Sequence, residues 1–261
     1  MASGTANQKP SSFSRPKPPV PANAATRFRI GSITKQFTSA AILKLAEEGK
    51  LGLQDEITVF IPDYPTQGKK ITIEHLLNHT SGIKSYTEME EWNNAMRRKD
   101  LSPRELIDFF KNEPMTFDPG TQYHYNNSGY ILLGYIVEKA SGKSYAKYLN
   151  EQFFKPLGMS NTYYDSYEPI IPRRAAGYSK DEKTYTNAEF LSTTQPYSAG
   201  ALISTVEDLT TWTRALHSGK ILKPESLQKA FKPNVLPDGT DTYYGYGWQI
   251  GTLQGSHTVE H

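Results

Sequence analysis

Apolar side chains recur at helical spacing in several stretches of this chain. In the first stretch, Ile33, Phe37, Ala41 and Leu45 lie four positions apart, which places them on one face of a helix. Gly49 follows this pattern and suits a C-cap, because glycine readily adopts the left-handed backbone that often ends a helix. Further helices are predicted within residues 69–83, 102–114, 128–159 and 204–222.

Local signals predict where several of these helices begin and end. Ser102 suits an N-cap, and Pro103 suits the first helical position that follows it. Gly142 divides the stretch 128–159 into two helices. Ser204 and Glu207 have the spacing of a capping box, which predicts that Ser204 caps the last long helix.

Strand signal is concentrated at the C-terminal end of the chain. Residues 243–261 combine glycines, aromatic residues and partial alternation of apolar and polar positions, which predicts strands and the start of a hairpin. The pattern as a whole predicts an α+β chain in which helices dominate.

Composition excludes some classes of function. The 261 residues include 29 basic and 27 acidic side chains, so the net charge of +2 gives no electrostatic reason to expect a nucleic-acid partner. No apolar run approaches the roughly 20 residues that a membrane-spanning helix needs. The chain has no cysteine, which removes disulfides and thiolate catalysis. Its start lacks the basic and apolar regions of a signal peptide.

Residues 1–25 are rich in Pro, Ser, Ala and Lys and poor in large apolar groups. Such a composition predicts a disordered arm, because little burial is available to offset the entropy of ordering. Its proline run is either a plain linker or a polyproline ligand for an SH3-like partner. The globular part is expected to extend over residues 26–261.

Ser32 and Lys35 are three positions apart at the predicted start of the first helix, so their side chains share one face. A neutral serine hydroxyl is a poor nucleophile and needs a neighbouring base. A lysine amine can serve when burial or nearby positive charge lowers its pKa. The alternative is that Ser32 only caps the helix and that Lys35 is a solvated surface residue.

Tyr125 and Asn127 lie in a loop just before a helix predicted to begin near Ser128. A tyrosine hydroxyl beside a lysine ammonium can carry protons during acyl transfer. An amide side chain two residues later can hold a substrate carbonyl or amide. The same residues are also consistent with an ordinary loop, since asparagine is common next to turns.

Three motifs together resemble those of a known superfamily. Residues 32–35 are Ser-Ile-Thr-Lys, residues 125–127 are Tyr-Asn-Asn, and residues 259–261 are Val-Glu-His. With the flanking stretches "FRIGSITKQFT", "LLNHTSGI" and "YGYGW", they resemble the serine β-lactamase and penicillin-binding-protein superfamily. They are most similar to the branch that contains class C β-lactamases, D-alanyl-D-alanine carboxypeptidases, alkaline D-peptidases and class VIII esterases.

The resemblance implies a role for each motif residue. Ser32 would be the acylated nucleophile, and Lys35 would accept its proton. Tyr125 would act with Lys35 as general base and then protonate the leaving group. Asn127 would bind the acyl-side amide of the substrate, and His261 would begin the third motif. No cofactor is implied, because these side chains supply the whole proton path.

The chain departs from the family pattern at its C-terminal end. The glycine that should follow His261 is absent, and so are later strands and a final helix. The implied fold is β-lactamase/transpeptidase-like, with the helical domain largely present and the antiparallel sheet largely missing from this chain. We therefore expect the apolar face of the helix that follows Ser32 to be exposed. We also expect impaired catalysis, because one lost oxyanion donor costs about 10²–10³ in rate.

His75 and His79 are four positions apart within residues 69–83, a helical spacing that can bind zinc. No third ligand is evident, and the glutamate of a metalloprotease motif is missing, so we expect no metal site.

The sequence therefore favours a serine hydrolase that acts through an acyl-enzyme on small esters, D-amino-acid peptides or β-lactams. The alternative is a catalytically impaired binding or regulatory module, or a fragment, of the same fold. The expected partners are a small-molecule or peptide substrate and a complementing segment or chain that supplies the missing sheet. The resemblance favours an extracytoplasmic location.

Overall fold

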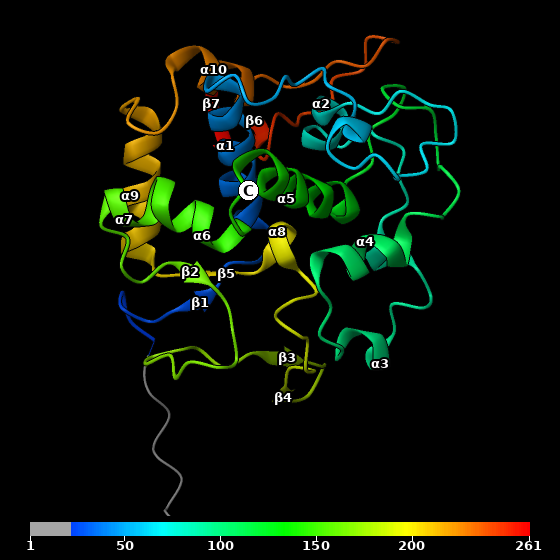
Figure 1. Ribbon diagram of the computed structural model, residues 1–261. Coiled ribbons are helices and arrows are strands. Elements are labelled where there is room, and N and C mark those ends of the chain that lie inside the picture. Colours follow the sequence, from blue (N-terminus) through cyan, green and yellow to red (C-terminus); the bar gives the residue numbers. More distant parts are fainter. Residues whose placement is uncertain (1–21) are drawn as a thin grey trace, which may run out of the picture.

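The computed structural model of the chain describes residues 22–261 (Figure 1). Most of the arm predicted for residues 1–25 therefore lies outside the described residues. The helices are α1 Thr34–Glu47, α2 Ile73–Leu77, α3 Asn94–Arg97, α4 Pro103–Phe110, α5 Asn127–Ser141, α6 Tyr145–Leu149, α7 Lys155–Leu157, α8 Tyr197–Gly200, α9 Val206–His217 and α10 Pro224–Ala230. The strands are β1 Phe28–Arg29, β2 Tyr163–Tyr164, β3 Tyr178–Lys180, β4 Tyr185–Asn187, β5 Leu202–Ser204, β6 Gln249–Leu253 and β7 Ser256–Glu260.

Helix α1 runs through the middle of the molecule and contacts α5, α8, α6 and α10 (Figure 1). Its aromatic residue Phe37 stacks on Trp212 of α9, with ring centroids 4.1 Å apart. Both rings are fully buried, so the contact ties α9 to the central helix.

The apolar face of α1 is covered, so the prediction that it would be exposed is wrong. From Phe37 to Leu43 every residue of α1 is buried, and so is Leu45. The cover comes from the helices around α1 and from the chain that enters the C-terminal hairpin. At Gly247 a Cβ atom would lie 2.9 Å from the backbone oxygen of Lys35, so the backbone approaches α1 more closely than a side chain would allow.

In the part of the chain that the structure describes, three small antiparallel sheets complete an α+β fold. The first has the order β1-β5-β2, and β3-β4 and β6-β7 are two-stranded. The β6-β7 hairpin, in which Gln249 pairs with Glu260, confirms the strands predicted within residues 243–261. Strands are less concentrated there than predicted, since β1, β2 and β5 lie elsewhere in the chain. The sequence did not indicate these strands, because they have only two or three residues each, too few to show a periodicity. The prediction that a larger sheet is missing stays a prediction.

The ends of α4 and α5 agree with the predicted caps, whereas the predicted cap of α9 is wrong. Ser102 and Glu105 form a capping box at the start of α4, and Gly142 ends α5 with a φ of 68°. Ser204 is not a cap, because it is the last residue of β5. Thr205 caps α9 instead, and its side chain accepts from the backbone N–H of Asp208.

Helix α2 is shorter than predicted because the chain leaves the helical conformation soon after Leu77. Asn78 follows the helix, and His79 adopts a φ of +62°, which no helix can continue. Within residues 22–261, no helix has both the length and the apolar character needed to cross a membrane.

Candidate active site

Ser32 lies in a 3-10 turn, Gly31–Ile33, that leads directly into α1. Its hydroxyl caps neither the turn nor the helix, and Lys35 has no exposed surface. The alternative of a capping serine and a solvated lysine is therefore wrong for this pair. The amine Nζ of Lys35 lies 3.2 Å from the Ser32 hydroxyl oxygen Oγ.

The Lys35 amine has two further partners, and both come from distant parts of the chain. Nζ donates to Oδ1 of Asn127 at 2.9 Å and to the backbone oxygen of Ala199 at 3.0 Å. It also lies over the aromatic rings of Tyr125 and Tyr130, 4.8 Å and 5.4 Å from their centroids. Burial away from water lowers the pKa of Lys35 to about 7, because the charged form loses its hydration.

Asn127 is the first residue of α5, and the preceding Asn126 caps the helix by accepting from the N–H of Gly129. The Asn127 side chain is bound by protein at both ends. Its Oδ1 faces Lys35, and its Nδ2 donates to the Thr87 hydroxyl at 3.1 Å. In this structure Asn127 therefore orients the lysine, in addition to lining the pocket next to Ser32.

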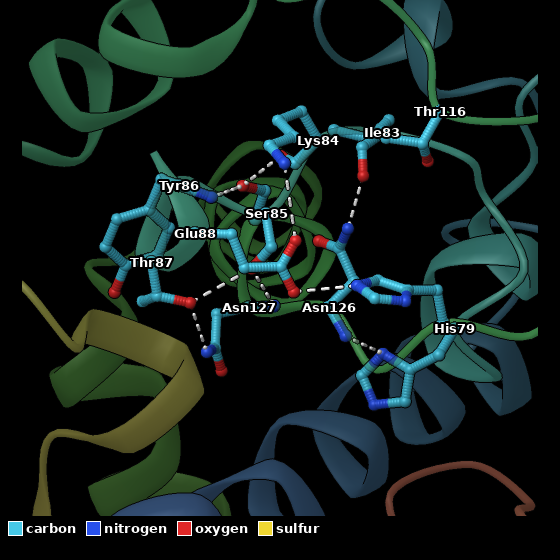
Figure 2. Close-up of polar contacts among 12 residues, drawn as sticks. His79, Ile83, Lys84, Ser85, Tyr86, Thr87, Glu88, Thr116, Asn126 and Asn127 are labelled. Carbon is cyan, nitrogen blue, oxygen red and sulfur yellow. Dashed lines mark hydrogen bonds and ion pairs between the residues drawn. The ribbon is translucent and has the colours of Figure 1, made fainter. Parts of the chain in front are cut away.

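The loop before α5 is held by hydrogen bonds to residues 79–88, which Figure 2 shows in close-up. The Asn127 backbone N–H donates to the Ser85 hydroxyl at 3.2 Å, and the Ser128 hydroxyl donates to the Lys84 carbonyl at 2.8 Å. The amide of Asn126 donates to the carbonyl of Ile83. These contacts fix the direction in which the loop presents its side chains.

His261 reaches the same place from the end of β7, beside α1 and α5 (Figure 1). Its Nδ1 lies 2.9 Å from the carbonyl of Gly247, and its Nε2 lies 3.4 Å from the Tyr125 hydroxyl. Burial and, to a smaller extent, the nearby Lys35 charge lower the pKa of His261 to about 4, although the hydrogen bond with the Gly247 carbonyl partly opposes this shift. Burial raises the pKa of Tyr125, and a hydrogen bond with Ser32 partly opposes that rise.

A pocket of about 280 Å³ opens beside Ser32. Its walls come from β1, the 3-10 turn, the Tyr86–Glu88 segment and the chain around α8. The lining residues are Arg29, Gly31, Ser32, Tyr86, Thr87, Trp92, Asn127, Asp165, Leu191, Thr193, Pro196, Ala199, Gly200 and Ala201. A larger hollow of about 610 Å³ beside α9 and α10 contains none of the predicted site residues.

The two histidines considered as metal ligands do not share a helix face. His75 lies on α2, where its Nδ1 accepts from the backbone N–H of Thr72 at 3.3 Å. His79 lies beyond the end of that helix, and its Nδ1 accepts from the N–H of Asn126. The interpretation that these two histidines lie on one helix is therefore wrong, because α2 ends at Leu77, before His79.

The sequence indicated Ser32 and the four residues gathered around it, Lys35, Tyr125, Asn127 and His261. It did not indicate the supporting roles of Ala199, Thr87 and His79. The Ala199 carbonyl carries no side-chain signal, and it is 164 positions from the lysine that it binds. Thr87 looks like an ordinary turn residue. The stretch "LLNHTSGI" resembles a family segment, but nothing local in it indicates what His79 contacts.

A family model described as Beta-lactamase matches residues 8–261 of the chain. The chain belongs to the Beta-lactamase family. This agrees with the resemblance carried by the three motifs, and a class C-like branch is consistent with the relatives that follow.

Curated relatives of this Beta-lactamase family member include a penicillin-binding protein of Bacillus subtilis (strain 168), 34% identical over 246 residues. That match covers 88% of this chain and 53% of the relative. Protein flp of Staphylococcus aureus (strain N315) is 32% identical over 250 residues, which are 93% of this chain and 49% of that protein. The chain thus spans about half the length of these relatives.

The chain matches a larger share of several solved structures of similar fold. A penicillin binding protein from Bacillus halodurans has a TM-score of 0.80 and 32% identity, over 91% of this chain and 73% of that chain. D-amino acid amidase from Ochrobactrum anthropi SV3, complexed with L-phenylalanine amide, has a TM-score of 0.79 and 29% identity, over 92% and 71%. An octameric penicillin-binding protein homologue from Pyrococcus abyssi has a TM-score of 0.74 and 33% identity, over 90% and 56%.

Proposed function

We propose that this chain is a serine hydrolase that forms an acyl-enzyme on Ser32. The observation that carries the proposal is the burial of Lys35, whose amine touches the Ser32 hydroxyl and whose pKa is lowered to about 7. An amine with that pKa is partly neutral at neutral pH and can accept a proton. An exposed lysine at the same spacing would be almost fully charged and unable to act as a base.

The partners of Lys35 support this direction of proton transfer. The neutral amine has two N–H groups and one lone pair. The Asn127 Oδ1 and the Ala199 carbonyl can only accept, so each takes one N–H. The lone pair is then left for the third neighbour, which is the Ser32 hydroxyl.

Tyr125 supplies the second proton in this proposal. Its pKa is raised, so the phenol is protonated at neutral pH and is a donor rather than a base. The Gly247 carbonyl can only accept from His261, which puts the imidazole proton on Nδ1 and leaves Nε2 as an acceptor toward the Tyr125 hydroxyl. His261 thereby orients the phenol.

The proposed reaction runs in two stages. The Ser32 proton moves to Lys35 Nζ as Oγ bonds to the substrate carbonyl carbon, and the carbonyl oxygen becomes an oxyanion. When the oxyanion collapses, the bond to the leaving group breaks and that group takes the proton of Tyr125. Lys35 then returns its proton to the Tyr125 oxygen, and water hydrolyses the acyl-enzyme.

The proposed substrates are small esters, D-amino-acid peptides or β-lactams. The names of relatives support this range, since they include penicillin-binding proteins and a D-amino acid amidase. A pocket of about 280 Å³ suits a substrate of a few residues at most. We also predict that a complementing segment or chain, by supplying the missing sheet, raises the rate of hydrolysis.

The test is the intact mass of the protein after incubation with a penicillin and, separately, with a fluorophosphonate. A Ser32→Ala variant is the control. We expect an added mass in the unsubstituted chain that the variant lacks. No added mass with either reagent, on protein that circular dichroism reports as folded, would reject the hydrolase and favour a binding module or an incomplete fragment.

A further inference from the structure

His79 holds the chain on both sides of Tyr125. Its backbone oxygen accepts from the N–H of His124 at 3.0 Å, and its Nδ1 accepts from the N–H of Asn126 at 3.0 Å. Figure 2 shows the second of these bonds, between the His79 ring and Asn126. The residues directly before and after Tyr125 are therefore anchored to one residue, which fixes the position of the Tyr125 backbone.

The His79 ring also packs against the Tyr125 ring. Their centroids are 4.4 Å apart, and the centroids of the Tyr244 and Tyr130 rings lie 4.7 Å and 5.1 Å from that of His79. His79 is 1% exposed, so the face of the Tyr125 ring that contacts His79 meets protein and not solvent. Burial also lowers the pKa of His79, which keeps Nδ1 unprotonated and able to accept.

Simple core packing does not account for a histidine here, because His79 is unfavourable in two ways. Its φ of +62° lies in the left-handed region, which few residues other than glycine adopt, with asparagine, aspartate and histidine the more frequent exceptions. Its Nε2 is buried and has no hydrogen-bond partner among the described residues. A buried apolar residue would fill the same space without the unpaired nitrogen.

We propose that His79 is a positioning residue that holds the Tyr125 hydroxyl where it can protonate a leaving group. The inference rests on the proposed function, because it gives Tyr125 that task. It predicts that the Nδ1 acceptor matters more than the ring, since Nδ1 anchors the backbone of the next residue, Asn126.

Three substitutions at this position test the acceptor, and two of them suit the positive φ. Asparagine and glycine both tolerate a positive φ, and both remove the ring. In His79→Asn the amide Oδ1 is bonded to Cγ, as Nδ1 is in histidine, so it can accept from Asn126. His79→Gly has no acceptor, and His79→Ala is a second variant without one.

The experiment compares kcat/KM for two esters of the same acid, one with an alkyl alcohol and one with p-nitrophenol as the leaving group. Nitrophenolate leaves without a proton, whereas an alkoxide needs one. In His79→Gly we expect the alkyl ester to lose about 10–100-fold, since a small misplacement of a catalytic group costs that much. The p-nitrophenyl ester should lose less than about threefold, and His79→Asn should stay within about threefold of the unsubstituted chain on both esters.

Equal losses on the two esters, in variants that still melt cooperatively above the assay temperature, would show general damage and overturn the inference. The same conclusion follows if His79→Asn is as slow as His79→Gly and His79→Ala on the alkyl ester. An unsubstituted chain that hydrolyses neither ester would instead reject the proposed function. The two failures are therefore distinguishable in one set of measurements.

Discussion

The lowered pKa of Lys35 makes a quantitative prediction about acylation. If the neutral amine is the base, the rate follows its neutral fraction, which for a pKa of about 7 is about 0.1 at pH 6 and about 0.9 at pH 8. The rate should therefore rise about tenfold over that interval and then level off. His261, with a pKa of about 4, and Tyr125, with a raised pKa, do not titrate in this range.

The assay is the rate of added mass with a fluorophosphonate between pH 5.5 and pH 9, corrected for hydrolysis of the reagent. An ordinary exposed lysine has a pKa near 10.4, and its neutral fraction at pH 8 is below about 0.01. A rate that still rises about tenfold per pH unit between pH 8 and pH 9, or one that does not change between pH 6 and pH 8, would refute the assignment of Lys35 as the base.

Stability gives an independent measurement of the same pKa. Because the pKa of Lys35 is about 7 in the folded chain and 10.5 when the amine is exposed in the unfolded chain, the unfolded chain binds more protons between these pH values. The unfolding free energy therefore rises with pH in that window, by about 2 kcal/mol between pH 7 and pH 9. A Lys35→Met variant has no amine to titrate, so it lacks this pH-dependent contribution. The substitution leaves the Asn127 and Ala199 oxygens without their lysine donor, and the resulting loss of stability is the same at both pH values. Urea unfolding should thus show the difference between the two proteins changing by that amount, and a constant difference would contradict the buried amine.

Other substitutions test the proton donor, a close helix contact and a cap. Tyr125→Phe should lower kcat/KM by about 10²–10⁴-fold for an alkyl ester and far less for the p-nitrophenyl ester, and equal losses would exclude Tyr125 as the donor. Gly134→Ala would bring a Cβ atom to 2.1 Å from the Ser198 hydroxyl, so we expect a loss of about 1–3 kcal/mol in urea unfolding, which an unchanged midpoint would contradict. Ser102→Ala removes the capping box with Glu105 and should cost about 1 kcal/mol in the same assay without changing kcat/KM, whereas a change in activity would mean that α4 affects the site.

Much of the helical framework could be predicted from the sequence, because its signals are local. The spacing of apolar residues placed α1, the glycine at 142 placed the end of α5, and Ser102 with Pro103 placed the start of α4. At α9 the prediction was wrong, because the capping-box spacing indicated Ser204 whereas Thr205 caps the helix. Ser204 and Thr205 are both good caps, and the pairing of Ser204 with Phe28 in the sheet leaves Thr205 for α9.

The geometry of the site was less accessible, because it depends on contacts between distant residues. The spacing of Ser32 and Lys35 is visible in the sequence, but the burial of the lysine is not. That burial requires Asn127, 92 positions away, and Ala199, 164 positions away. His79 was missed for a related reason, since its hydrogen bonds go to a loop about 45 positions later, whereas its sequence spacing points to His75.

The basicity of Lys35 is therefore a property of the fold rather than of its motif. The same four residues on an exposed helix would leave the amine hydrated and charged at neutral pH. Here the segment at Gly247, just before β6, contributes twice, since its backbone packs against α1 beside Lys35 and its carbonyl orients His261 toward Tyr125. Displacement of this segment would let water reach Lys35, return its pKa toward the ordinary value and release the proton donor at the same time. Loss of one contact region would thus remove both the base and the acid of the proposed reaction.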